Sequence, residues 1–209
     1  MLMISEVNIA MQNKHWIGLS GSHRVGKSTL AMEFAEKNGY TFVPTDIHGI
    51  QKNLGYVSSK QDYSFKERMQ IQIAILDTLS ERYKEWHANL GNVITDRTPY
   101  DFITYTLLAV NDKCDDEDYQ QLLDYIHKCQ LVASCYFDDI FVIQPGIPVV
   151  ADSKSAAASK AFMHKFNSIM LGEVTGRDHI KVMPSYLLHP NNRMIYLENN
   201  ISKAILWNK

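Results

Sequence analysis

Short apolar runs alternate along the chain with longer stretches in which apolar residues recur every three or four positions. The short runs have the length of strands and end in polar or turn-forming residues, whereas the longer stretches have the period of amphipathic helices. The pattern predicts five strands, at residues 15–20, 40–44, 92–95, 139–144 and 179–183. Because strands that alternate with helices form parallel sheets covered on both faces, we expect an α/β fold with three layers and about five mostly parallel strands.

The clearest helical pattern lies between the second and third predicted strands, where large apolar residues from Phe65 to Trp86 fall on one face. Ser64 and Glu67 have the spacing of a capping box, so this helix should begin near Phe65. Weaker patterns predict helices at residues 99–110 and 117–134 and a closing helix after Pro190. The apolar faces of these helices are expected to form the core.

Length and charge limit the classes of protein to which the chain can belong. Its 209 residues predict a single domain over residues 15–209, preceded by an N-terminal extension over residues 1–14. The formal net charge of −2 argues against a uniformly basic nucleic-acid-binding protein, although it leaves room for a local basic groove. Specific motifs must therefore decide the function.

Cysteine usage and hydropathy indicate the compartment. Cys114, Cys129 and Cys135 form no C-x-x-C pair and leave an odd thiol, which favours a reducing environment. No apolar run reaches the roughly 18 residues of a membrane span, and the start of the chain has no signal-peptide core. We therefore expect a cytoplasmic protein with no membrane partner.

Residues 21–29, GSHRVGKST, form the most specific motif and lie between a predicted strand and a predicted helix. They match the phosphate-binding pattern G-x-x-x-x-G-K-[ST] at every fixed position. In such a loop the backbone N–H groups and the helix N-terminus bind phosphate, the lysine reaches the β- and γ-phosphates, and the serine hydroxyl binds Mg²⁺. A glycine-rich turn with a solvated lysine is the alternative. The motif predicts nucleotide contacts for Gly21, Ser22, His23, Arg24, Val25, Gly26, Lys27, Ser28 and Thr29.

The third predicted strand ends in the sequence TDRTPYDF, which places Asp96 and Arg97 at the carboxyl edge of the sheet. Ligands of open α/β sheets bind at this edge, and an acidic residue there can hold the Mg²⁺ shell. Arg97 is then a candidate to bind a phosphate or a substrate oxygen. The alternative is structural, with Asp96 capping the helix that begins at Pro99 and Arg97 as its surface ion partner. Asp101 is interpreted as a favourable charge in the first turn of that helix.

Asp46 follows the second predicted strand and reaches the same edge of the sheet. A carboxylate in that position can accept a proton from an acceptor hydroxyl, which makes Asp46 a candidate catalytic base. Capping of the helix that follows is the competing interpretation.

A short segment of small and basic residues follows the fourth predicted strand and predicts a lid over about residues 148–162. Lys154 is the residue expected to close over the transferring phosphate. A solvated loop with incidental lysines is the alternative.

Four sequences, GSHRVGKST, TDIHG, TDRTPYDF and PGIPVVADSKS, together resemble in order and spacing the P-loop kinases that act on nucleosides and nucleotides. The similarity is greatest to phage-type nucleotide kinases and extends to ribosylnicotinamide and deoxynucleoside kinases. It implies γ-phosphoryl transfer from ATP to a nucleoside or nucleotide acceptor, with Mg²⁺ held by Ser28 and Asp96. It also implies catalytic roles for Lys27, Asp46 and Arg97. The D-R pair matches the E-R-S of deoxynucleoside kinases only in part, which leaves the acceptor open.

Other functions remain as alternatives at this point. One is a kinase that phosphorylates hydroxymethyl-pyrimidines in phage DNA, which requires a basic stripe around the acceptor site. Another is a P-loop NTPase that hydrolyses ATP without transferring phosphate, and a third is a module that only binds the nucleotide. The sequence does not decide between a monomer and a homodimer.

Overall fold

The computed structural model describes residues 14–56, 63–110, 114–146 and 159–202. Within them five parallel strands form one sheet in the order β2-β3-β1-β4-β5. The strands are β1 (Trp16–Ser20), β2 (Thr41–Val43), β3 (Val93–Thr95), β4 (Asp139–Ile143) and β5 (Ile180–Met183). Each strand lies within the range expected from the hydrophobic pattern, so the predicted α/β fold is confirmed.

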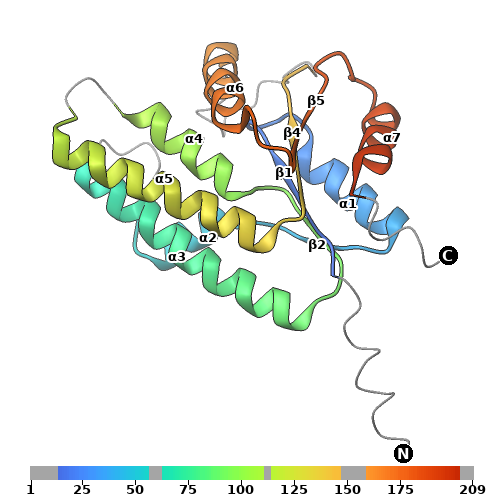
Figure 1. Cartoon of the computed structure of the whole chain (residues 1–209), viewed down its shortest axis with the longest axis horizontal. Coiled ribbons are helices and arrows are strands. Elements are labelled where there is room, and N and C mark those ends of the chain that lie inside the picture. Colours follow the sequence, from blue (N-terminus) through green and yellow to red (C-terminus); the bar gives the residue numbers. More distant parts are fainter. Residues whose placement is uncertain (1–13, 57–62, 111–113, 147–158, 203–209) are drawn as a thin grey trace, which may run out of the picture.

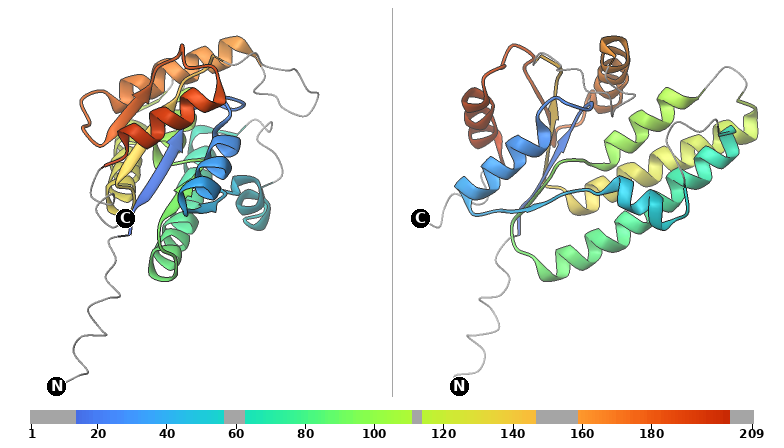
Figure 2. Two further views of the ribbon diagram at one scale, coloured as in Figure 1. Left: turned by 90° about the vertical axis from the view of Figure 1, so that its right-hand side faces the viewer. Right: turned by 180° about the vertical axis from the view of Figure 1, so that it is seen from behind.

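Helices cover both faces of this sheet. They are α1 (Lys27–Asn38), α2 (Ile47–Asn53), α3 (Phe65–Asn89), α4 (Pro99–Ala109), α5 (Asp116–Tyr136), α6 (Lys160–Val174) and α7 (Pro190–Asn200). α1 and α7 lie on one side of the sheet, and α3, α4, α5 and α6 lie on the other (Figure 1). Views from the side and from behind show the same three layers (Figure 2). No helix in the described part of the chain is long and apolar enough to cross a membrane.

Two predicted segments fall wholly or largely outside the described residues. They are the N-terminal extension, of which only residue 14 is described, and the lid, of which residues 147–158 are not described. Lys154 therefore lies outside the described part of the chain. The end of the predicted lid range is the first turn of α6, which Ser159 caps by accepting a hydrogen bond from the backbone N–H of Phe162.

Successive strand residues point to opposite faces of the sheet, so each face has its own core. The core under α3 to α6 contains the strand residues Trp16, Val43, Val93, Ile140 and Val142. The core under α1 and α7 contains the strand residues Ile17, Leu19, Ile94, Phe141 and Ile143. The strands are therefore apolar on both faces, as buried parallel strands must be.

α3 begins where its sequence predicts. The Ser64 hydroxyl accepts a hydrogen bond from the backbone N–H of Glu67, and the Glu67 carboxylate accepts one from the backbone N–H of Ser64 at 2.8 Å. This reciprocal pair satisfies two donors that the helix itself leaves unpaired.

A buried ion cluster around Asp139, the first residue of β4, closes the amino ends of the strands. Its carboxylate accepts a hydrogen bond from His15 Nε2 at 3.0 Å and pairs with Lys181. Ser202, just after α7, donates its backbone N–H at 2.6 Å and its hydroxyl at 2.8 Å. Burial alone would raise the pKa of Asp139, but these partners lower it well below its usual range. The end of α7 is thereby fastened to the edge of the sheet opposite the candidate site.

The carboxyl ends of the parallel strands meet at one edge. From β1 the chain passes outward to β2, returns to β3, and then crosses to β4 and β5 on the other side of β1. Such a change of direction leaves a crevice at the carboxyl ends of the central strands, where ligands of open α/β sheets bind. The segments that follow β1, β2 and β3 reach this crevice.

Candidate active site

The glycine-rich loop between β1 and α1 has the backbone that a phosphate-binding loop needs. Gly21 has φ 139° and Gly26 has φ 87°, both in the region that favours glycine. A Cβ atom on Gly21 would lie 2.4 Å from the backbone oxygen of Ile143 in β4. Arg24 is the one described non-glycine residue with positive φ, at 61°. The glycines are therefore fixed both by backbone conformation and by the close approach of a neighbouring strand.

Lys27, the first residue of α1, is folded back onto this loop. It is only 7% exposed, and its Nζ donates hydrogen bonds to the backbone oxygens of Gly21 at 2.6 Å and Ser22 at 2.8 Å. Burial lowers the pKa of Lys27 to about 8, and the nearby Asp101 carboxylate opposes that shift. The ammonium group is thus poised inside the loop, held by neutral oxygens that an anionic ligand can replace.

Ser28 and Asp96 meet in front of the loop. The Ser28 hydroxyl donates a 2.5 Å hydrogen bond to Asp96 Oδ2, and the backbone N–H of Thr45 donates a 3.0 Å hydrogen bond to Asp96 Oδ1. Asp96 is not the cap of α4, because Thr98 occupies that position and accepts from the backbone N–H of Tyr100. The sequence prediction that Ser28 and Asp96 share one site is therefore consistent with the geometry, and the capping alternative for Asp96 is wrong.

The Ser28–Asp96 pair has the chemistry of a magnesium site. Mg²⁺ prefers hard oxygen ligands and in phosphate-transfer sites is held by one or two protein oxygens together with phosphate oxygens and water. A hydroxyl and a carboxylate supply such oxygens here. Among the described residues no group of three or more His, Cys, Asp or Glu side chains could hold a metal alone. The pair fits a cation that arrives with a nucleotide better than one held by protein alone.

Asp101 is a residue of the site whose full role the sequence did not reveal. It is fully buried, and its two carboxylate oxygens accept hydrogen bonds from the backbone N–H groups of Gly21 at 3.1 Å and Thr98 at 2.9 Å. Burial raises the pKa of Asp101, while Lys27 and Arg97 act in the opposite direction. The local capping pattern of α4 was visible in the sequence. The contact with Gly21, which fixes the start of the phosphate loop, was not.

Arg97 approaches the loop from β3 and contacts His23. Its Nη2 atom lies 3.4 Å from His23 Nδ1, and its guanidinium lies 5.7 Å from the centre of the Tyr105 ring. Because arginine only donates hydrogen bonds, Nδ1 of His23 must be the acceptor. Burial and then the charges of Arg97, Lys27 and Arg24 lower the pKa of His23 to about 4. His23 is therefore a neutral imidazole that orients the Arg97 guanidinium at the carboxyl edge of the sheet.

Asp46 lies on the exposed side of the same edge. Its Oδ1 atom accepts a 2.8 Å hydrogen bond from the backbone N–H of Gly49 and caps α2. The capping role that competed with catalysis in the sequence is thus present. A Cβ atom on Gly49 would lie 2.0 Å from Asp46 Oδ2, so this glycine leaves room for the carboxylate. Its role as a catalytic base stays a prediction.

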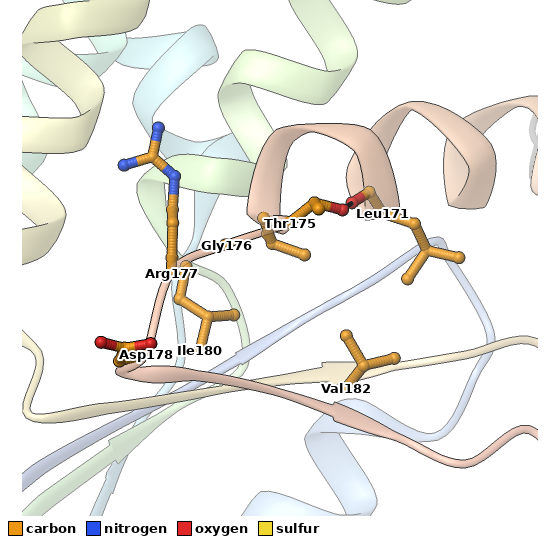
Figure 3. Close-up of a pocket in the computed structure, with 8 residues that line it drawn as sticks. Leu171, Thr175, Gly176, Arg177, Asp178, Ile180 and Val182 are labelled. Carbon is orange, nitrogen blue, oxygen red and sulfur yellow. Dashed lines mark hydrogen bonds between the residues drawn. The ribbon is translucent and has the colours of Figure 1, made fainter.

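A separate cavity of about 390 Å³ lies between the end of α6 and the edge strand β5 (Figure 3). Its apolar wall includes Leu171, Val174 and Val182. The Arg177 side chain points away from this wall, and its guanidinium lies 5.5 Å from the centre of the Tyr100 ring. No residue that the sequence identified as a candidate for binding or catalysis lines this cavity.

The fold and the loop geometry together define a P-loop NTPase domain of the nucleoside and nucleotide kinase-like group. A family model described as an AAA domain matches residues 16–173, so the chain belongs to that family. No curated protein matches the chain.

Solved structures of kinases share the fold. Thymidylate kinase from Candida albicans is 18% identical with a TM-score of 0.66, over 89% of this chain and 90% of that one. Deoxyadenosine kinase from M. mycoides is 20% identical with a TM-score of 0.59, over 88% and 97%. NadR protein, in complex with NR, is 19% identical with a TM-score of 0.62, and this chain spans 50% of its length. These low identities establish a common fold and leave activity to be argued from the site.

Proposed function

We propose that this protein is an ATP- and Mg²⁺-dependent kinase that transfers the γ-phosphoryl group to a nucleoside or nucleotide acceptor. The observation that carries the proposal is the contact between the Ser28 hydroxyl and the Asp96 carboxylate directly after the P-loop. It brings together, from β1 and β3, the two oxygen ligands that the superfamily uses for a nucleotide-bound cation. The kinase structures that share the fold support the choice of phosphate transfer over another use of the P-loop.

The remaining residues have complementary tasks in this reaction. Lys27 exchanges its bonds to Gly21 and Ser22 for the β- and γ-phosphates. Magnesium, when bound, neutralises charge on the phosphate oxygens. An acceptor oxygen forms a bond to the γ-phosphorus as the bond from that phosphorus to the β–γ bridging oxygen breaks. A hydroxyl acceptor releases its proton to Asp46, whereas a phosphate acceptor needs no base.

Arg97 supports an acceptor that carries negative charge. Its neighbour His23 is neutral, so the contact at 3.4 Å orients the guanidinium without neutralising it. Lys27 and Arg97 then present two cations at the carboxyl edge, opposed by Asp96 and Asp101. Planar guanidinium groups bind phosphate through paired hydrogen bonds. A nucleoside monophosphate therefore suits this edge of the site better than an uncharged nucleoside.

The test is transfer of ³²P from γ-labelled ATP with Mg²⁺ to nucleosides, nucleoside monophosphates, and duplex DNA with or without 5-hydroxymethyluracil. We expect label in a small nucleotide, and loss of at least about 100-fold in rate for Lys27→Ala. Lys37→Ala is the matched control, because Lys37 lies in the last turn of the same helix and is 57% exposed. Label in modified DNA alone would redirect the assignment to a DNA kinase. Release of free phosphate with every acceptor would exclude kinase activity.

Asp46→Asn separates catalysis from helix capping. Asparagine caps helices about as well as aspartate but is a far weaker base, so α2 should be retained. With a hydroxyl acceptor we expect kcat to fall about 100-fold while the Kd for ATP stays unchanged. Asp46→Ala removes both functions and should in addition lower the melting temperature. Full activity of Asp46→Asn toward a hydroxyl acceptor would remove Asp46 from the mechanism.

A further inference from the structure

Arg193, in the first turns of α7, is a buried arginine whose recorded hydrogen-bond partners are backbone oxygens. It is 3% exposed, its Nη1 donates a 2.5 Å hydrogen bond to the backbone oxygen of Val25, and its Nε donates a 2.6 Å hydrogen bond to that of Leu187. Val25 is a P-loop residue, 168 positions away in the chain. A long side chain from the closing helix therefore reaches into the phosphate loop from behind.

The two carbonyl groups belong to different walls of the crevice. Val25 directly precedes Gly26, whose φ of 87° turns the loop into α1. Leu187 lies in the segment of residues 184–189 that joins β5 to α7. Close contact with the end of β4 confines this segment, because a Cβ atom on Gly146 would lie 2.7 Å from the backbone oxygen of Ser185. Arg193 thus joins the turn of the P-loop to a segment at the carboxyl end of the edge strand.

No ion pair recorded among the described residues includes Arg193. A buried guanidinium without a carboxylate partner is costly unless its N–H groups are hydrogen-bonded. Burial accordingly lowers the pKa of Arg193, and no charged neighbour offsets the effect. A neutral side chain packed in the same place would avoid this cost. The two short hydrogen bonds are what the arginine provides in return.

We propose that Arg193 is a positioning residue for nucleoside triphosphate binding, holding the P-loop and the segment 184–189 in one fixed arrangement through Val25 and Leu187. The proposal rests on the proposed function, because it takes the ligand of the P-loop to be ATP. Tightly held backbone N–H groups bind phosphate without paying an ordering cost at the moment of binding. Neither lysine nor glutamine can reproduce the bridge, since each presents a single terminal donor group where arginine uses two separated nitrogens.

The experiment compares wild type, Arg193→Lys, Arg193→Gln and a matched control, Tyr196→Phe. Tyr196 is also in α7 and donates a hydrogen bond to a backbone oxygen, but to that of Val182 in β5 at 3.1 Å. Two readouts are taken below the unfolding temperature of every variant. One is the Kd for ATP by calorimetry, and the other is amide hydrogen exchange of residues 21–27 and 184–189 in the nucleotide-free protein.

We expect both Arg193 variants to raise the Kd for ATP by about tenfold or more, as loss of a charge-assisted hydrogen bond does, and to speed exchange in both segments. Tyr196→Phe should change the Kd less than about twofold. Rescue of ATP binding by Arg193→Lys would show that charge alone suffices and would overturn the proposal. A lowered melting temperature with unchanged Kd and unchanged exchange would reduce Arg193 to a packing role and also overturn it.

The exchange readout keeps this inference separable from the proposed function. If wild type fails to bind ATP, the kinase proposal fails, and so does the claim that ATP is the ligand whose binding Arg193 favours. Faster exchange in both segments for the Arg193 variants, with none for Tyr196→Phe, would still support the bridge. Unchanged exchange would reject the bridge whatever ligand the P-loop takes.

Discussion

The neutral state of His23 makes the stability of the protein depend on pH in a defined window. Burial and the positive charges of Arg97, Lys27 and Arg24 lower its pKa from 6.5 to about 4 in the folded protein. Above pH 6.5 the imidazole is neutral in both folded and unfolded chains, so His23 adds no pH dependence there. Between pH 6.5 and 4 only the unfolded chain takes up the proton, so the free energy of unfolding must fall as the pH falls.

The size of this effect follows from the two pKa values. At pH 5 protonation of the unfolded chain at His23 lowers the free energy of unfolding by about 2 kcal/mol relative to pH 8. Other groups titrate over the same range, so the contribution of His23 must be isolated with a variant. His23→Gln removes the titration and keeps a side-chain acceptor for Arg97.

The assay is urea denaturation of wild type and His23→Gln at pH 8 and pH 5. Wild type should lose about 2 kcal/mol more than the variant between the two pH values. Equal losses would mean that His23 has an ordinary pKa, and the account of Arg97 orientation by a neutral imidazole would then be refuted.

Three other predictions test separate parts of the structure. Because the pKa of Lys27 is about 8 and only the ammonium form binds phosphate, the Kd for ATP without Mg²⁺ should rise about tenfold from pH 7 to pH 9, measured by calorimetry, whereas Lys27→Arg should show no such rise. Gly21→Ala, which combines a φ of 139° with a backbone oxygen 2.4 Å from the new Cβ, should lower the free energy of unfolding by at least about 2 kcal/mol. Gly91→Ala, where that Cβ would meet nothing within 4 Å, should change it by less than about 1 kcal/mol; similar losses in urea unfolding would contradict the argument. Lys128→Ala breaks an exposed ion pair with Asp77 and should also cost less than about 1 kcal/mol, so a larger loss would show that this surface pair is stabilising.

Local sequence patterns were sufficient to predict the sheet and the phosphate loop. Strand positions follow from short apolar runs, and the capping box of Ser64 and Glu67 marks the start of α3. Asp96 was found because a carboxylate that ends a central strand must lie at the carboxyl edge. In each case the determining interaction lies within a few residues along the chain, or follows from the geometry of parallel strands.

Long-range contacts were the part that local patterns could not supply. Asp101 contacts Gly21 across 80 positions, and Arg97 contacts His23 across 74. In the sequence Asp101 looked like an ordinary first-turn charge, because its capping partner Thr98 lies only three residues away. Nothing in the pattern of α7 marked Arg193, since its partners are backbone oxygens that any residue provides.

The central claim is phosphate transfer, and ³¹P NMR of the wild-type reaction with ATP, Mg²⁺ and a mixture of nucleoside monophosphates tests it most directly. The spectrum resolves transfer from hydrolysis in a single sample. The account predicts that ADP appears together with an equal amount of a newly phosphorylated acceptor, with little inorganic phosphate. Inorganic phosphate in an amount equal to ADP, with no phosphorylated acceptor, would contradict it.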